Sequence, residues 1–247
     1  MSAILDVAHL RKTFGGVRAV DDVSFAVDAG SLVALIGPNG AGKTTCFNCI
    51  NGQLAPDDGT VALGSARIDG LAPFVIARKG VGRTFQVAAT FASMTVRESL
   101  ALALAAHEGR DAAVLTGMLD IASPRIDALL ARVGMADLDD AHCAALAYGD
   151  AKRLELALTL AGEPRLLLMD EPTAGMSPRS RRDLMTLATG LAESANVAVL
   201  FTEHDMDIVF GFADRVLVLD RGVLIAAGPP AAIKADARVQ AVYLGGG

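Results

Sequence analysis

One stretch of the sequence decides the fold: Gly37-Pro38-Asn39-Gly40-Ala41-Gly42-Lys43-Thr44. An apolar, β-like run over residues 32–36 precedes it, and a run with helical character over residues 44–50 follows it. A glycine-bearing loop between a strand and a helix points several backbone N–H groups at one place, beside the positive end of the helix dipole. Such a loop binds phosphate, with the Lys43 ammonium reaching the β and γ phosphates and the Thr44 hydroxyl binding Mg²⁺. The stretch therefore predicts a site for ATP and Mg²⁺.

A second predicted strand carries two adjacent carboxylates at its end. Residues 166–169 are apolar, and Asp170 and Glu171 follow them directly. Ligands of open α/β sheets bind beyond the carboxyl ends of the strands, so we expect this pair to lie beside the phosphates. In that position Asp170 would hold Mg²⁺, directly or through water. Glu171 would polarise the attacking water as the general base of phosphoryl transfer.

The remaining sequence places these motifs in an α/β chain. Short β-like runs cover residues 4–8 and 23–27, and a small β region is expected over residues 60–68. From residue 166 onward, β-like runs alternate with helical ones, which predicts a parallel sheet with crossover helices. A last hairpin-like strand and a short helical tail are expected after Asp220-Arg221-Gly222.

Residues 90–162 interrupt this pattern, because they are almost wholly helical in character. Thr95 and Glu98 have the spacing of a capping box. Ser123-Pro124 supplies an N-cap and a proline at the first helical position, and Gly134 is placed to end the same helix. These signals predict a helical insertion in the α/β frame.

Composition restricts the function further. The 28 acidic residues outnumber the 22 basic ones, and the resulting charge of −6 opposes binding to nucleic-acid phosphates, so no nucleic-acid partner is expected. No apolar stretch approaches the ~20 residues needed to cross a bilayer. The three cysteines do not form the pattern of a disulfide framework. We therefore expect a cytoplasmic protein.

Cys46 and Cys49 form a C-x-x-C pair on the helix that follows the phosphate loop. At that place small buried side chains are the expectation, and redox or metal chemistry is the less favoured alternative. Two further polar residues, Gln86 and His204, follow β-like runs where a sensor of the γ-phosphate would be useful. On their own, a structural role for each is the commoner interpretation. His9, His107 and His142 show no partner pattern and are read as ordinary surface or core residues.

Together these residues resemble the ATP-binding subunit of an ABC transporter over essentially the whole chain. The resemblance implies a P-loop NTPase (RecA-like) core with an N-terminal antiparallel β subdomain and an inserted α-helical subdomain, the ABC ATPase cassette. On that pattern residues 1–247 form a single domain, in which residues 1–89 and 163–247 make the core with its β subdomain and residues 90–162 make the helical subdomain.

The resemblance also implies roles for single residues. Phe14 would stack on adenine, Gln86 would bind the metal and link it to a membrane partner, and His204 would contact the γ-phosphate. The nucleotide would be bound by this chain's loop together with Thr45, and by the signature segment of a second subunit, which in this chain corresponds to Leu146-Ala147-Tyr148-Gly149-Asp150.

Two residues of the signature segment depart from the family pattern Leu-Ser-Gly-Gly-Gln. Ala147 has no hydroxyl, and Asp150 places a carboxylate where glutamine is common. Backbone N–H groups and the dipole of the following helix can still bind phosphate there, but a carboxylate beside an anion is repulsive. We expect this change to weaken the composite site.

Several stretches point to one branch of the family, the importers of branched-chain or related hydrophobic amino acids, and to the larger of their two ATPase subunits. They are Leu146 to Glu155, Ala174 to Pro178, Glu203 to Met206 and Tyr243 to Gly245. The resemblance implies a second ABC ATPase subunit, with a heterodimer favoured over a homodimer, two membrane permease subunits, and a periplasmic or extracellular substrate-binding protein. It also implies a peripheral position on the inner face of the plasma membrane.

Other functions remain open at this stage. An importer of urea or amides and a lipopolysaccharide exporter share much of the pattern. A non-transport ABC ATPase acting on DNA or ribosomes would need a basic face or a second cassette, which this short acidic chain does not show. A module that binds ATP without hydrolysing it is disfavoured by Glu171 and His204.

Overall fold

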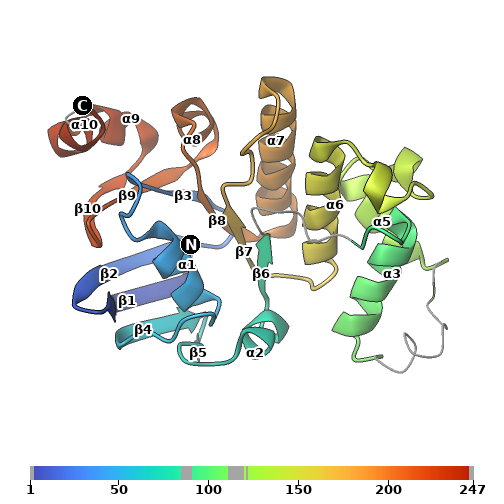
Figure 1. Cartoon of the computed structure of the whole chain (residues 1–247), viewed down its shortest axis with the longest axis horizontal. Coiled ribbons are helices and arrows are strands. Elements are labelled where there is room, and N and C mark those ends of the chain that lie inside the picture. Colours follow the sequence, from blue (N-terminus) through green and yellow to red (C-terminus); the bar gives the residue numbers. More distant parts are fainter. Residues whose placement is uncertain (1–2, 85–90, 111–119, 121, 245–247) are drawn as a thin grey trace.

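The computed structural model describes residues 3–84, 91–110, 120 and 122–244. Two β-sheets and a group of helices form an elongated molecule, in which the N-terminal sheet and the helices α3 and α6 lie toward opposite ends (Figure 1). No helix in these ranges is long and apolar enough to cross a bilayer.

The central sheet has six strands in the order β10-β9-β3-β8-β7-β6. The strands β3, β6, β7, β8 and β9 run parallel, and β10 pairs antiparallel with β9 as the expected hairpin. Their bounds are β3 Leu32–Ile36, β6 Val81–Thr84, β7 Leu166–Asp170, β8 Ala198–Thr202, β9 Arg215–Asp220 and β10 Val223–Gly228. The predicted parallel sheet is therefore confirmed, and its strands end at one edge, where the phosphate loop begins.

The second sheet is antiparallel and belongs to the N-terminal part of the chain. Its order is β2-β1-β4-β5, with β1 Ala3–Phe14, β2 Val17–Asp28, β4 Asp58–Leu63 and β5 Ala66–Arg67. The expected β region over residues 60–68 is thus two short strands. The hairpin of β1 and β2 ends in a turn next to Phe14, which brings this aromatic ring toward the phosphate loop.

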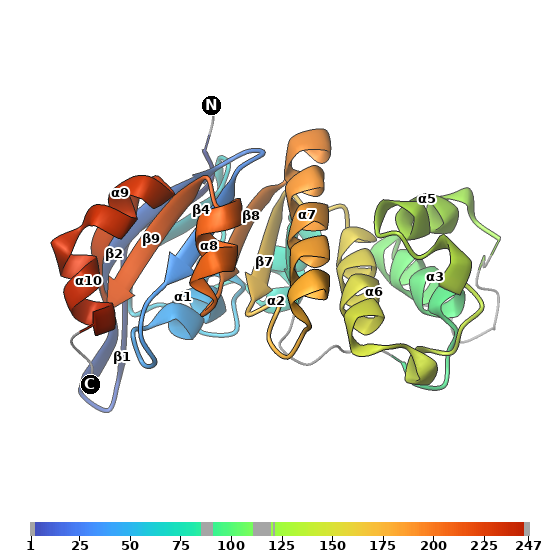
Figure 2. The same ribbon diagram turned by 90° about the horizontal axis from the view of Figure 1, so that it is seen from above.

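Helices cover the sheets and form the insertion. Their bounds are α1 Lys43–Ile50, α2 Pro73–Arg78, α3 Val96–His107, α5 Pro124–Arg132, α6 Tyr148–Leu160, α7 Pro178–Ala195, α8 Met206–Phe212, α9 Pro230–Ala235 and α10 Ala237–Leu244, with short 3-10 turns at Ala136–Leu138 and Cys143–Ala145. Figure 2 shows α7 beside the central sheet, α6 next to α7, and α5 and α3 together beyond α6. Helix α2 was not predicted, because its six residues give too short a pattern.

The capping signals in the insertion are confirmed. The Thr95 hydroxyl accepts from the backbone N–H of Glu98, and the Glu98 carboxylate accepts from the backbone N–H of Thr95, which is the predicted capping box. Ser123 caps α5 through the N–H of Arg125. Gly134 follows this helix with a φ of 67°, a left-handed conformation that a helix end favours in glycine.

The core has two parts, one on each face of the central sheet. Along β3, Leu32, Ala34 and Ile36 pack with the helices of the insertion and of the C-terminal half, whereas Val33 and Leu35 pack against α1 and the antiparallel sheet. Both faces of the strand are buried, because layers of structure cover a parallel sheet on its two sides. This burial fixes β3, and with it the start of the phosphate loop.

Candidate nucleotide-binding site

The phosphate loop forms a tight turn in which two glycines, Gly37 and Gly42, cannot be replaced without a clash. A Cβ atom on Gly37 would lie 2.2 Å from the carbonyl oxygen of Leu219, and one on Gly42 would lie 2.3 Å from that of Ala19. Gly42 also has a φ of 105° at the N-cap of α1, which side chains rarely adopt. The sequence therefore folds locally into a cradle with the N-terminus of α1 at its base.

Lys43 lies inside this cradle. Its side chain is buried, and Nζ donates to the carbonyl oxygens of Gly37 at 2.7 Å and Pro38 at 3.1 Å. Burial lowers the pKa of Lys43, and the nearby carboxylates of Glu171 and Asp170 oppose that effect. The ammonium is thus held close to the loop by neutral acceptors, which it can leave for an anionic ligand.

One buried hydroxyl organises the two carboxylates at the end of β7. Thr202, at the end of β8, donates from Oγ1 to Oδ1 of Asp170 at 2.8 Å, and the same oxygen accepts from the backbone N–H of Glu171 at 3.0 Å. Glu171 has a φ of 47°, a costly conformation for a residue with a side chain. The hydrogen bond from the Glu171 N–H to Thr202 helps to hold that backbone conformation.

His204 is brought to Glu171, as expected for two groups acting on one phosphate. The imidazole Nε2 lies 2.9 Å from Oε1 of Glu171. Both groups line a cavity of about 310 Å³, together with Phe14, Lys43, Thr44 and other residues of the loop: Ala19, Asn39, Gly40, Ala41, Gly42 and Thr45. The structure thus gathers most of the predicted nucleotide-binding residues of this chain around one opening.

Gly37, Pro38 and Phe14 differ from the other predicted binding residues in where they lie. Gly37 and Pro38 offer their carbonyl groups to Lys43 and do not line the same opening. The Phe14 ring is half exposed at 46%, and the Lys12 ammonium lies 5.6 Å from its centroid. An exposed ring at the rim of the cavity is available for stacking on a planar base.

The signature segment lies elsewhere, at the start of α6. Ala147 is the N-cap residue without a side-chain cap, and Tyr148 is 49% exposed. Gly149 and Asp150 lie in the first turn, where an Asp150 oxygen is 3.8 Å from Nη1 of Arg153. None of these four residues lines the cavity at Lys43. This chain alone therefore holds the two predicted halves of a nucleotide site apart.

Gln86 lies outside the described residues, so its predicted contacts stay a prediction. Asp170 and Thr44 offer the carboxylate and hydroxyl oxygens that Mg²⁺ prefers. The described residues contain no group of three or more His, Cys, Asp or Glu that could enclose a metal. This donor set fits Mg²⁺, which usually takes one or two protein ligands and completes its coordination with phosphate oxygens and water.

Sequence reasoning missed Glu203 and Thr202. The Glu203 carboxylate is buried and accepts from both the backbone N–H and the hydroxyl of Thr173, at 2.9 and 2.6 Å. It ties the end of β8 to the turn that follows Glu171. The signal available in the sequence was the run Thr202-Glu203-His204, three polar residues at the end of a buried strand.

The cysteines have no metal or redox partner among the described residues. Cys46, Cys49 and Cys143 are free and buried. Burial raises the pKa of the Cys49 thiol to about 11 and raises that of Cys46 further. The expectation that Cys46 and Cys49 are small buried side chains therefore agrees with the structure.

A glycine-rich loop before a helix, a buried lysine, and a carboxylate pair with a histidine define the site of a P-loop ATPase. Comparison with known proteins identifies the family within this class. Residues 20–174 match the family model described as ABC transporter, and residues 223–247 match that of the branched-chain amino acid ATP-binding cassette transporter. The chain belongs to the ABC transporter family, and it is an ATPase subunit of that kind.

Individual relatives agree with this assignment. The chain is 38% identical to the high-affinity branched-chain amino acid transport ATP-binding protein LivG of Escherichia coli and to the corresponding protein BraF of Pseudomonas aeruginosa, with 98% of each chain covered. A solved structure of the ADP conformation of MJ1267, an ATP-binding cassette of an ABC transporter, has a TM-score of 0.86 at 28% identity, covering 99% of this chain and 100% of that one. A nucleotide-free cassette has a TM-score of 0.84 at 27% identity, covering 98% of each chain.

Proposed function

We propose that this chain powers the uptake of branched-chain or related hydrophobic amino acids, as the larger ATPase subunit of an importer. The observation that carries the proposal is the match of residues 223–247 to the branched-chain amino acid family. Relatives named for branched-chain amino acid transport also match this chain over nearly its whole length. Relatives named for phosphonate and sulfate import are 33% identical.

In the proposed mechanism, Lys43 and the loop amides bind the triphosphate, and Thr44 and Asp170 would hold Mg²⁺, which would neutralise phosphate charge. Glu171 accepts a proton from the attacking water, and His204, bonded to Glu171 at 2.9 Å, orients that carboxylate and contacts the γ-phosphate. Phe14 stacks on the base. Gln86 would bind the metal and link it to the membrane partner.

The second half of the site comes from a second ABC ATPase subunit. Because the signature segment at α6 does not line the cavity at Lys43, two subunits that face each other would complete two sites. ATP then holds the pair closed, and its hydrolysis allows the pair to open. We propose a heterodimer, since the proposed role is that of the larger of two different subunits.

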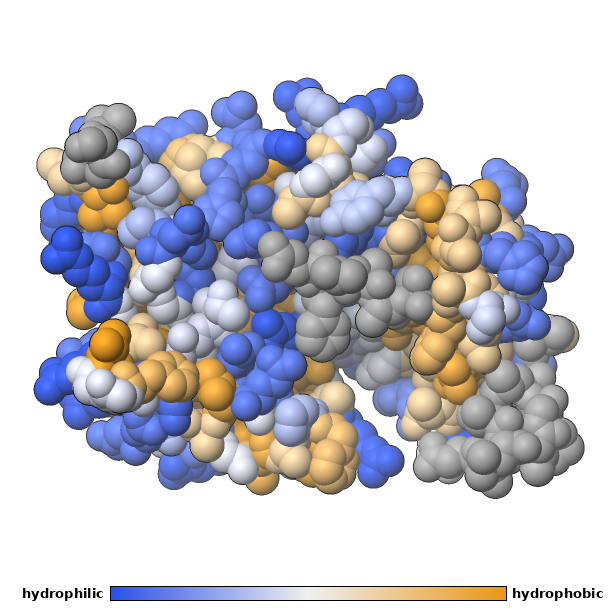
Figure 3. Space-filling view, viewed as in Figure 1, coloured by the Kyte–Doolittle hydropathy of each residue, from blue (hydrophilic) through white to orange (hydrophobic). Residues whose placement is uncertain are grey.

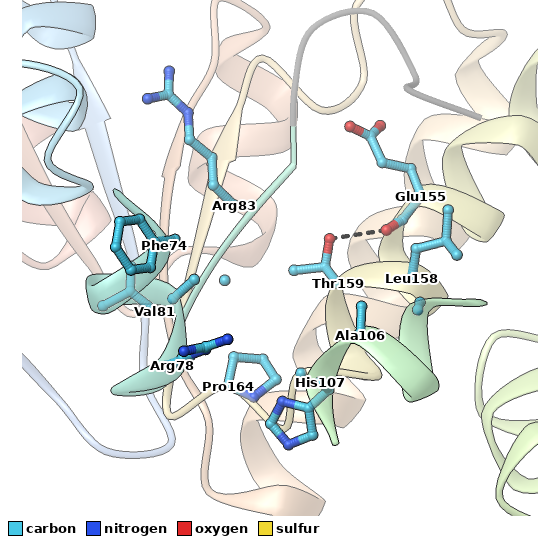
Figure 4. A pocket seen from close by; sticks show the side chains of 14 residues that line it. Phe74, Arg78, Val81, Arg83, Ala106, His107, Glu155, Leu158, Thr159 and Pro164 are labelled. Carbon is cyan, nitrogen blue, oxygen red and sulfur yellow. Dashed lines mark hydrogen bonds between the residues drawn. The ribbon is translucent and has the colours of Figure 1, made fainter. Parts of the chain in front are cut away.

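A groove beside the central sheet suits the permease partner. It has a volume of about 560 Å³ and lies between α2 with β6 and α3 with α6. Figure 3 shows apolar side chains on both sides of the hollow in this part of the molecule. Phe74, which is 64% exposed, lies on one wall, and Ala106 and Leu158 lie on the other (Figure 4). We place a permease segment here, which puts the chain on the inner face of the membrane.

The proposed function is tested with the complex in liposomes. The chain, a second ATPase subunit and two permeases are reconstituted, and ATPase activity is measured with and without a substrate-binding protein loaded with leucine. If hydrolysis and transport are coupled in this complex, the loaded binding protein should raise the ATPase rate and ATP should drive leucine uptake. Uptake of urea, sulfate or a phosphonate in place of leucine would contradict the substrate assignment. An ATPase rate that is the same with and without the permeases and the binding protein would contradict a role in transport.

We predict that Asp150→Gln strengthens nucleotide-driven pairing of the two ATPase subunits. The carboxylate lies at the start of α6, where the partner's phosphates are proposed to bind, and its removal ends a like-charge contact. The substitution also removes the favourable interaction of the Asp150 carboxylate with the dipole of α6. This interaction contributes about 0.3–1 kcal/mol, so thermal stability should fall slightly. Sedimentation with ATP in the Glu171→Gln background measures pairing. Asp183→Asn, on the neighbouring helix α7, is the control for lost negative charge. Unchanged pairing would show that Asp150 does not face the nucleotide.

A further inference from the structure

Arg83 lies on β6, and its side chain reaches the carboxylate of Asp170, the proposed metal ligand. Strand β6 pairs in parallel with β7, with Arg83 opposite Leu168 and Thr84 opposite Met169. From this register the Arg83 side chain extends to Asp170, and Nη2 donates to Oδ2 at 2.9 Å. The two side chains are only 9% and 16% exposed, so the pair is shielded from solvent.

The guanidinium is also fixed by the helix of the phosphate loop. Its Nη1 donates to Oδ1 of Asn48 on α1 at 2.7 Å and to Oε1 of Gln53 at 3.2 Å. The group lies 5.8 Å from the centroid of the Phe47 ring. Burial lowers the pKa of Arg83, and Asp170 opposes this effect. One rigid planar group thus joins α1, β6 and β7, which a lysine with a single ammonium cannot reproduce.

Both oxygens of Asp170 are therefore held from opposite sides. Oδ1 accepts from Thr202 on β8, and Oδ2 accepts from Arg83 on β6. Each carboxylate oxygen has two lone pairs, so these bonds fix the plane of the group and leave acceptor capacity for a cation. Groups that hydrogen-bond a metal ligand in this way commonly change metal affinity roughly 10–100-fold when they are removed.

Arg83 also borders the groove between α2 and α3. It lines that groove with Phe74 and Arg78, and Figure 4 shows its guanidinium extending away from Phe74 and Pro164. One residue therefore borders the groove at one end of its side chain and contacts Asp170 at the other.

We propose that Arg83 is a positioning residue that orients Asp170 for Mg²⁺ and connects that carboxylate to the groove between α2 and α3. The inference rests on the proposed role of Asp170 as a metal ligand. A displacement of β6 by a partner in the groove would move the guanidinium, and with it the plane of the carboxylate. No proton transfer or bond to Arg83 is involved.

The test measures metal binding by the full chain without hydrolysis. Mn²⁺ is titrated into the protein with AMP-PNP, and free Mn²⁺ is followed by electron paramagnetic resonance. Arg83→Gln should raise the Mn²⁺ dissociation constant about 10-fold or more. Arg83→Lys should raise it as well, because the retained charge cannot bond Asn48 and Asp170 together. Binding of a fluorescent ATP analogue in EDTA should stay within about twofold of the native value, since Lys43 and the loop are unchanged.

Arg97→Gln is the matched control. Arg97 also pairs with aspartates, Asp127 and Asp139, but it lies on α3 away from the loop. It should leave Mn²⁺ binding unchanged. The inference is overturned if both Arg83 variants bind Mn²⁺ as tightly as the native chain or more tightly. It is also overturned if their affinity for the ATP analogue in EDTA falls by the same factor as their affinity for Mn²⁺. Failure of the native chain to bind Mn²⁺ with AMP-PNP would instead contradict the metal role of Asp170 itself.

Discussion

Glu171→Gln is expected to stop ATP hydrolysis while ATP stays bound. The amide keeps the size of the side chain and can still contact His204, but it cannot accept a proton from water. Loss of a general base lowers a rate by roughly 10²–10⁴-fold. The cradle at Lys43 is untouched, so ATP affinity should stay within about twofold of the native value. The subunit pair should then remain closed with ATP.

Phosphate release and nucleotide binding are measured on the same complex of two ATPase subunits. Glu193→Gln is the control, because Glu193 is an exposed glutamate on α7, away from the cavity. It should keep native activity. Turnover at the native rate by Glu171→Gln would show that another group activates the water.

The second large effect is expected for Lys43→Ala, which should strongly weaken nucleotide binding. The Nζ atom now held by the carbonyl oxygens of Gly37 and Pro38 is the group proposed to move to the phosphates. Hydrogen bonds to charged groups contribute about 1.5–3 kcal/mol, so affinity should fall roughly 10-fold or more. A ligand that binds only the folded state raises the melting temperature. The rise in melting temperature expected with Mg²⁺-ATP should therefore be clearly smaller in Lys43→Ala than in the native chain.

Differential scanning fluorimetry with and without Mg²⁺-ATP measures this loss. Lys79→Ala, which removes an exposed lysine after α2, should keep the full shift. An unchanged ATP-induced shift in Lys43→Ala would contradict the proposed phosphate site.

The fold could be predicted from the sequence because local signals and burial agree. The strand over residues 32–36 is short and apolar, and the structure buries all five side chains of β3. Cap residues at Thr95 and Ser123 marked helix starts correctly, since a side chain that satisfies a helix N-terminus acts over only a few residues. Helix α2 has no such cap, and it was missed.

The site could be predicted only in part. Lys43, Glu171 and His204 belong to motifs with recognisable spacing, and the structure gathers them in one cavity. Thr202, Glu203 and Arg83 act through partners far away in the sequence. Arg83 and Asp170 are 87 positions apart, and only the pairing of β6 with β7 brings them together. The division of the chain at residues 90 and 162 and the roles of the site residues stay predictions.

The burial of every thiol has a practical consequence for experiments on this protein. Cys46, Cys49 and Cys143 are at most 5% exposed, and buried structural cysteines react poorly because the thiolate is disfavoured. A maleimide dye or spin label should therefore react with a single cysteine engineered on the surface and spare the native ones. Distances between two subunits could then be followed in an otherwise unaltered chain, and slow labelling of the native thiols would report local opening of the core.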